Sequence, residues 1–215
     1  RNLIELGTRS LLVEDGKKLI LIACGLGIRQ DENFFGPYSL CGDESLDKTL
    51  KQYAFVREDI TDVFLTHLHF DHCGGAIEWN DDKSGYRPAF KNAQFWTNEN
   101  HWQWATEPNP REKASFLKDN ILPMQESGQL QFLPTPKTGN YGFAPDLKMD
   151  VIFVDGHTEK QMLPVIQYQE KTIVFAADLI PTAGHIPQVY VMGYDTRPLR
   201  TMEEKGKCRK QCVEK

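Results

Sequence analysis

Three of the six histidines of this chain lie within six consecutive residues, in the segment His67–His72, which reads HLHFDH. A random chain of this composition would contain the pattern His-x-His-x-Asp-His with a chance of about 3 in 10,000. The run Val63–Thr66 before it is apolar and rich in β-forming residues, so it predicts a buried strand that ends directly before His67. We therefore expect the histidines at the end of a strand.

This spacing favours a metal site. In an extended chain, residues i and i+2 project to the same side, so His67 and His69 can bind one cation. Asp71 and His72 are expected to face elsewhere. Imidazole and carboxylate ligands together favour zinc, iron or manganese over magnesium or calcium. Four potential ligands in two directional sets predict two adjacent metal ions.

Length and charge limit the class of protein. The 215 residues are enough for one domain with a large core and too few for two ordinary domains, so we expect a single domain over residues 1–215. Lys and Arg number 25 against 30 Asp and Glu, which gives a net charge of −5. This balance disfavours nucleic acid as a partner.

Location is predicted from apolar runs and cysteines. Runs such as Leu19–Cys24 are far shorter than the roughly 20 residues that span a bilayer, so we expect no membrane partner. The five cysteines are an odd and scattered set, typical of thiols in a reducing compartment, which predicts a cytoplasmic protein. The chain starts at Arg1 without Met, so the earlier loss of a signal segment stays open.

Short apolar runs alternate with helical patterns, which predicts layered α/β sheets with helices outside. Helices are expected after the caps Ser45 and Asn98, and over Glu112–Leu122, which we expect to stop at Pro123. The expected connections are a polar turn over Asp81–Pro88 and an exposed loop over Pro134–Pro145. The expected strands are Ser10–Val13, Leu19–Cys24, Val63–Thr66, Ala93–Thr97, Gln129–Leu133, Met149–Val154, Leu163–Gln169 and Thr172–Ala176.

Two later elements complete a known pattern. Gly156-His157-Thr158 follows one expected strand, and Asp178 follows another. With HLHFDH, these elements resemble the metallo-β-lactamase-fold hydrolase superfamily over almost the whole chain, and its quorum-quenching N-acyl homoserine lactone lactonase-like branch most of all. The resemblance implies an α/β fold, a four-layer αββα sandwich, and we leave open a truncation at both ends.

The resemblance also implies a ligand set for two divalent metal ions, zinc first, with iron or manganese as alternatives. One ion is held by His67, His69 and His157, the second by Asp71 and His72, and Asp178 bridges them. Two such ions hold a shared hydroxide that attacks the substrate, and one polarises the substrate oxygen. Asp71 is the expected catalytic residue, which passes a proton to the leaving group.

Three positions depart from the family pattern. A final histidine ligand is usual some tens of residues after the bridging aspartate, but the only later one is His185, seven residues on, so a ligand beyond Lys215 and the role of His185 stay open. Ala23 stands where an aspartate commonly supports the ligand loop. Pro181 stands where lactonases often have a tyrosine.

The function predicted from the resemblance is a metal-dependent hydrolase of an ester or lactone carbonyl, with an acyl homoserine lactone as one candidate substrate. A phosphodiesterase or RNA-processing hydrolase of the same fold, and a metal-free binding module, stay open as alternatives. The expected partner is a small molecule, and a homodimer is left open. Some aromatic side chains are expected either in a substrate pocket or in the core, namely Phe34, Phe35, Tyr38, Trp102 and Trp104.

Overall fold

The computed structural model describes residues 4–42 and 45–213, without the side chains of 211–213. The described residues form two compact units. Unit 1 contains residues 4–7, 97–111 and 132–213, and unit 2 contains residues 8–96 and 112–131. The expectation of one domain over residues 1–215 stays a prediction.

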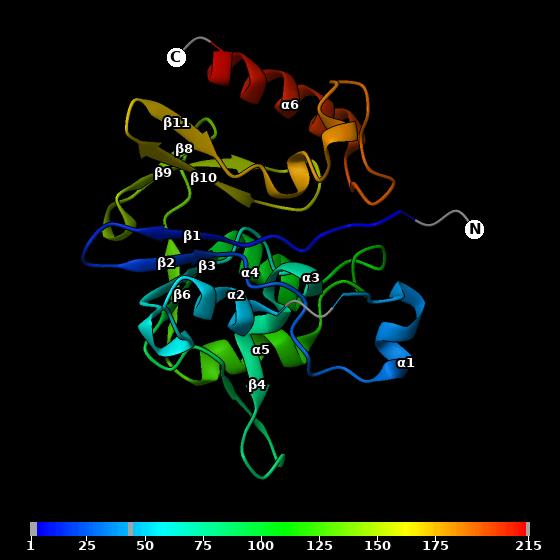
Figure 1. Cartoon of the computed structure of the whole chain (residues 1–215). Helices are drawn as coiled ribbons and strands as arrows, with labels where there is room; N and C mark the ends of the chain where they lie inside the picture. Colours follow the sequence, from blue (N-terminus) through cyan, green and yellow to red (C-terminus); the bar gives the residue numbers. More distant parts are fainter. Residues whose placement is uncertain (1–3, 43–44, 214–215) are drawn as a thin grey trace. The chain divides into compact units, whose positions relative to one another are not determined.

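Unit 2 is built on a mixed sheet with the strand order β1-β2-β3-β6-β7 (Figure 1). β1 and β2 are antiparallel, whereas β2, β3 and β6 pair in parallel, with Leu21 opposite Val63 and Val63 opposite Phe95. The unit boundary falls inside β6 and β7. The strands are Leu11–Glu14 (β1), Leu19–Ile22 (β2), Asp62–Phe64 (β3), Gln94–Asn98 (β6) and Leu130–Leu133 (β7).

Local chemistry explains the start of this sheet. Between β1 and β2, the carboxylate of Asp15 accepts backbone N–H bonds from Lys17 and Lys18, and Gly16 adopts a φ of 82°. Such a turn matches the twist of the two strands. The central strands are fully buried, and each buried Phe or Leu side chain contributes roughly 1.5–3 kcal/mol to folding.

Short helices and a hairpin complete unit 2. The side chain of Ser45 caps α2, as expected, by accepting from the N–H of Lys48. α5 contacts α3 and the hairpin β4–β5. These elements are Glu32–Phe35 (α1), Gly36–Tyr38 (η1), Leu46–Gln52 (α2), Arg57–Asp59 (η2), Phe70–Cys73 (α3), Gly74–Ala76 (η3), Ile77–Trp79 (β4), Tyr86–Pro88 (β5) and Lys118–Glu126 (α5).

Unit 1 contains an antiparallel sheet of order β11-β10-β9-β8, and the long helix α6 lies along it (Figure 1). Ile152, Leu163 and Val165 of the sheet form one core cluster with Leu179 of η5 and Cys208 of α6. The elements are Glu99–Thr106 (α4), Tyr141–Ala144 (β8), Pro145–Leu147 (η4), Met149–Val154 (β9), Gln161–Tyr168 (β10), Lys171–Val174 (β11), Ala177–Leu179 (η5), Ala183–His185 (η6) and Pro198–Val213 (α6).

The expected α/β fold class is confirmed, and so is each expected strand within a few residues at its ends. Three local expectations were wrong. Residues 86–88 of the expected polar turn form β5, because they pair with β4. Residues 141–144 of the expected exposed loop form β8, because they pair with β9.

The third error concerns the helix expected over Glu112–Leu122. The helix begins only at Lys118 and continues through Pro123 to Glu126. Residues 112–117 are held in a turn instead, since the N–H of Ser115 donates to the carbonyl of Glu112 and the carbonyl of Ser115 accepts from the N–H of Phe70. Tertiary contacts therefore override the local helical pattern here.

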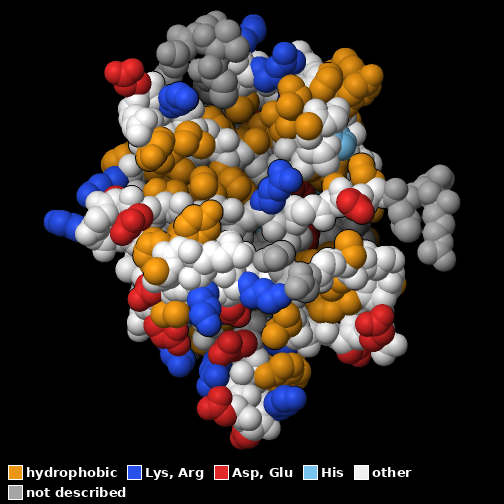
Figure 2. Space-filling view, viewed as in Figure 1, with side chains coloured by type: hydrophobic (Ala, Val, Ile, Leu, Met, Phe, Trp, Pro, Cys, Tyr) orange, Lys and Arg blue, Asp and Glu red, His pale blue; other side chains and the backbone are white. Residues whose placement is uncertain are grey.

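The surface carries charges of both signs. On the β4–β5 hairpin, Arg87 pairs with Glu78 at 2.8 Å and with Asp81 at 2.9 Å. Acidic and basic side chains alternate at the lower end of the face in Figure 2, where this hairpin projects. In the described part of the chain, no helix combines the length and the apolar character needed to cross a bilayer.

Candidate metal centre

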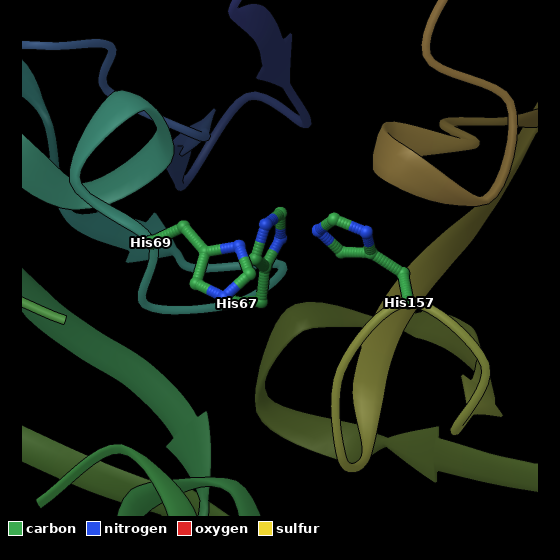
Figure 3. A group of neighbouring side chains, drawn as sticks. All are labelled: His67, His69 and His157. Carbon is green, nitrogen blue, oxygen red and sulfur yellow. The ribbon is translucent and has the colours of Figure 1, made fainter. Parts of the chain in front are cut away.

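Unit 2 presents His67 and His69 from the loop between β3 and α3 (Figure 3). Both are buried, at 0% and 7% exposure, and their rings lie 4.6 Å apart. The Nδ1 atom of His67 is 3.2 Å from the hydroxyl of Thr66. A ring nitrogen of each histidine lies within 4.8 Å of one in the other. The extended spacing therefore brings the two imidazoles together, as expected from the sequence.

Asp71 and His72 lie in the short helix α3, which follows His69 directly. This helical turn brings the ring of His72 to 4.1 Å from that of His67, so the expectation that His72 faces elsewhere was wrong. The Nε2 atom of His72 lies 3.5 Å from a carboxylate oxygen of Asp71. The side chain of Asp71 is 39% exposed, against 15% for His72. The side chain of Asp71 is thus the more accessible of the two.

The turn Ala23–Gly25 supports this segment through its backbone. The N–H of Cys24 donates to the carbonyl of His72 at 2.9 Å, and that of Gly75 donates to the carbonyl of Gly25 at 3.0 Å. Ala23 has a φ of 57°, so a residue without a supporting carboxylate adopts the left-handed turn. Burial raises the pKa of the Cys24 thiol to about 12, which keeps it protonated at neutral pH.

Unit 1 presents His157 and Asp178. His157 follows β9 (Figure 3), and Asp178 lies in η5 after β11. The Nε2 atom of His157 is 3.3 Å from a carboxylate oxygen of Asp178. On the other side of the ring, Nδ1 lies 3.0 Å from Asp195, whose side chain is buried. A carboxylate behind a metal-binding imidazole fixes its tautomer and orientation.

Helix α6 holds the His157 loop in place. The buried carboxylate of Glu204 accepts the N–H groups of Asp155 and Gly156 at 3.0 and 2.9 Å. A Cβ atom on Gly156 would lie 2.4 Å from the backbone nitrogen of Thr201, so only glycine allows this approach. The ammonium of Lys205 donates to two carbonyls in the loop that leads to Asp195. The α6 helix therefore positions both His157 and its carboxylate partner.

An aromatic cluster extends from the ligand segment in unit 2. The ring of Phe70 lies 5.1 Å from Phe34 and 5.3 Å from Tyr38. Tyr38 is 53% exposed, whereas Phe35 and Trp102 are buried. The aromatic residues singled out in the sequence thus divide between core positions and an accessible apolar surface.

His185 lies in η6 of unit 1, with Nδ1 2.7 Å from the hydroxyl of Thr182. Within residues 4–42 and 45–213, the groups of side chains that could hold a metal contain His157 or Asp178 but not His185. We therefore expect His185→Ala to keep the metal content of the unmodified protein, measured by elemental analysis after dialysis. Under the same conditions, His157→Ala should lose metal. Loss of one ion from His185→Ala would identify His185 as a ligand.

Sequence reasoning missed Glu112, Asp195 and Glu204. Each is a buried carboxylate beside a predicted ligand or its loop. None belongs to the family elements found in the sequence, and all lie far from their partners along the chain. The burial of these carboxylates is the feature that would have identified them. A single sequence does not show burial of charged residues, which are mostly exposed in proteins.

The chain belongs to the metallo-beta-lactamase superfamily, whose family profile matches residues 3–204. This match bears out the resemblance found in the three sequence elements and the α/β fold class. A comparison with curated protein sequences found no significant match.

Solved structures with the same fold cover most of this chain. A probable metal-dependent hydrolase from Staphylococcus aureus is 24% identical with a TM-score of 0.81, over 93% of this chain and 68% of its own. AidC, a dizinc quorum-quenching lactonase, is 23% identical with a TM-score of 0.69, over 94% and 67%. An N-acyl homoserine lactone hydrolase is 16% identical with a TM-score of 0.67, over 94% and 75%. The chain thus spans about two thirds to three quarters of their lengths.

Proposed function

We propose that this chain is a dinuclear metal-dependent hydrolase that opens lactones or cleaves esters. In this proposal His67, His69 and His157 bind one ion, Asp71 and His72 bind the second, and Asp178 bridges the two. The observation that carries the proposal is the proximity of ligand-type side chains. In unit 2, the rings of His69 and His72 lie 4.6 and 4.1 Å from that of His67, and Asp71 lies 3.5 Å from His72. In unit 1, His157 lies 3.3 Å from Asp178.

The side chains present fit such ions. Imidazole and carboxylate groups are ligands for zinc, iron and manganese, and we propose zinc first. Buried carboxylates lie behind two of the imidazoles, Glu112 behind His69 and Asp195 behind His157. This arrangement is typical of metal-binding histidines. The thiols of Cys24 and Cys73 donate to backbone carbonyls, those of His72 and Leu68, and burial raises the pKa of each thiol.

Bound divalent ions supply a water-derived nucleophile at neutral pH and polarise the substrate carbonyl. The residues of the chain have separate roles in this proposal. His67, His69 and His157 are buried side chains that would hold the first ion. Asp71 has the most exposed carboxylate of the set and passes a proton to the leaving oxygen.

The proposed substrate is a small acyl ester or lactone, with an acyl homoserine lactone as one candidate. Two similar structures are lactonases, and one of them contains N-hexanoyl-L-homoserine at its catalytic metal centre. The accessible rings of Phe34, Tyr38 and Phe70 provide an apolar surface beside the ligand segment that suits an acyl chain. The net charge of −5 does not favour a polyanionic substrate.

Metal analysis combined with a substrate panel tests this function. We expect elemental analysis of zinc-reconstituted protein to approach two ions per chain. Acyl homoserine lactones and aryl esters should be hydrolysed faster than bis-p-nitrophenyl phosphate. The apolar surface near the ligands favours an acyl group over a charged phosphodiester. A chelator-treated sample of the same protein is the control for metal dependence.

Two results would contradict the proposal. Protein that retains no transition metal after reconstitution is no metal-dependent hydrolase, and the metal-free binding module then becomes the better account. Faster cleavage of the phosphodiester than of every carbonyl substrate would move the chain to the phosphodiesterase alternative.

A further inference from the structure

The imidazole of His69 is enclosed by one short segment of unit 2, residues 112–116. A carboxylate oxygen of Glu112 lies 3.4 Å from Nε2 of His69. The ring of Phe116 lies 4.7 Å from the ring of His69. The carbonyl of Ser115 accepts the N–H of Phe70, the residue that follows His69, at 2.9 Å. Three different groups of this segment thus contact His69 or its neighbour.

Burial makes the carboxylate in this segment significant. The side chain of Glu112 is 4% exposed, and that of His69 is 9% exposed. A buried carboxylate is costly unless hydrogen bonds or opposite charges compensate it, so its position beside an imidazole needs a physical reason. With its proton on Nε2, the imidazole of His69 places a polar N–H group beside this carboxylate, at 3.4 Å, slightly longer than an ordinary N–H···O hydrogen bond.

We propose that Glu112 is a positioning residue for His69, an inference that rests on the proposed metal site. Glu112 keeps the proton of the neutral imidazole on Nε2, so Nδ1 carries the lone pair that a metal ion requires. The carboxylate also increases the basicity of the ring and thereby strengthens the bond to the ion. Glu112 itself does not contact substrate in this proposal.

The turn itself does not depend on the carboxylate. It is closed by the backbone bond from Ser115 to Glu112 at 2.8 Å, and a substitution at Glu112 leaves those backbone atoms in place. The effect of the side chain on His69 can therefore be separated from the effect of the segment on the fold. Glu112→Gln keeps the size and one acceptor oxygen, whereas Glu112→Leu keeps the size and removes the acceptor.

The experiment compares these two variants with the unmodified protein and with Glu126→Gln, a substitution at an exposed carboxylate on α5. Metal affinity is measured by competition with a chromogenic chelator. Visible spectra of the cobalt-substituted proteins report the geometry around the ion. Circular dichroism of the metal-free proteins checks that each variant is folded.

We expect Glu112→Leu to weaken binding of the more tightly held ion by about 10- to 100-fold and to change the cobalt spectrum. Glu112→Gln should recover part of the affinity, because its amide oxygen still accepts from Nε2, and Glu126→Gln should match the unmodified protein. If Glu112→Leu is folded and binds cobalt with unchanged affinity and spectrum, the positioning role is wrong. If Glu112→Leu does not fold, an unchanged metal affinity and an unchanged cobalt spectrum in Glu112→Gln overturn the positioning role equally. Failure of the unmodified protein to bind metal would instead reject the proposed function.

Discussion

Asp71→Asn is expected to lower turnover of the best lactone or ester substrate by about 100-fold or more, while the ion held by the three histidines remains bound. The substitution keeps the shape of the side chain but removes both a charged ligand of the second ion and the proposed proton donor. Asp71 is suited to that transfer because its side chain is 39% exposed and lies beside His72. Turnover and metal content are measured on the same preparation.

The matched control is Asp146→Asn, which changes an exposed aspartate in η4 of unit 1. It should leave turnover unchanged. An Asp71→Asn protein with near-normal turnover would remove Asp71 from the chemistry. An equal loss in both variants would point to a general effect of lost negative charge, which also contradicts the specific role.

The geometry of the segment His67–His72 was partly predictable from the sequence. His67 and His69 follow a buried strand, and extended geometry brings their rings together. The same geometry failed two residues later, because α3 begins at Phe70 and its turn brings His72 back to His67. A four-residue helix has too short a pattern to be recognised in a sequence.

Helix α6 was missing from the expected elements for a different reason. Among residues 198–210 of this helix, the buried positions are Thr201, Glu204, Lys205 and Cys208, which recur at helical spacing but are mostly polar. A search for an apolar stripe cannot find such a helix. Of these residues, Glu204 and Lys205 bind backbone atoms of the loops that carry His157 and Asp195, which accounts for their burial. The packing of this helix therefore depends on polar contacts with these loops, which hydrophobic patterning does not reveal.

The turn at Ala23 lacks the aspartate that is common in the family, and backbone contacts explain how it still holds the segment His67–His72. The family aspartate is absent, yet the turn Ala23–Gly25 still contacts the ligand segment through backbone hydrogen bonds. These bonds require a close approach of two backbones. Glycine at position 74 permits this approach, since any Cβ atom there would lie only 2.0 Å from the carbonyl oxygen of Leu26.

Gly74→Ala should therefore destabilise the protein by about 1–3 kcal/mol, the usual cost of overpacking. The backbone of Gly74, with φ −59° and ψ −31°, is one that alanine adopts readily, so the steric clash alone determines the sign. For a chain of this size, each kcal/mol lowers the melting temperature by roughly 2–4 °C. Thermal unfolding of the metal-free protein, followed by circular dichroism, measures the effect.

The control Gly193→Ala places its new methyl group where no atom lies within 4 Å. It should be neutral or slightly stabilising, since alanine restricts the unfolded chain more than glycine does. Equal melting temperatures for the two variants would show that the backbone at Leu26 moves aside without a loss of stability.

The expected clash has a second consequence. It moves the turn Ala23–Gly25 away from the ligand segment, where the N–H of Cys24 donates to the carbonyl of His72. Gly74→Ala should then also bind the second metal ion more weakly than Gly193→Ala does, which links the close approach of two backbones to the geometry of the ligands.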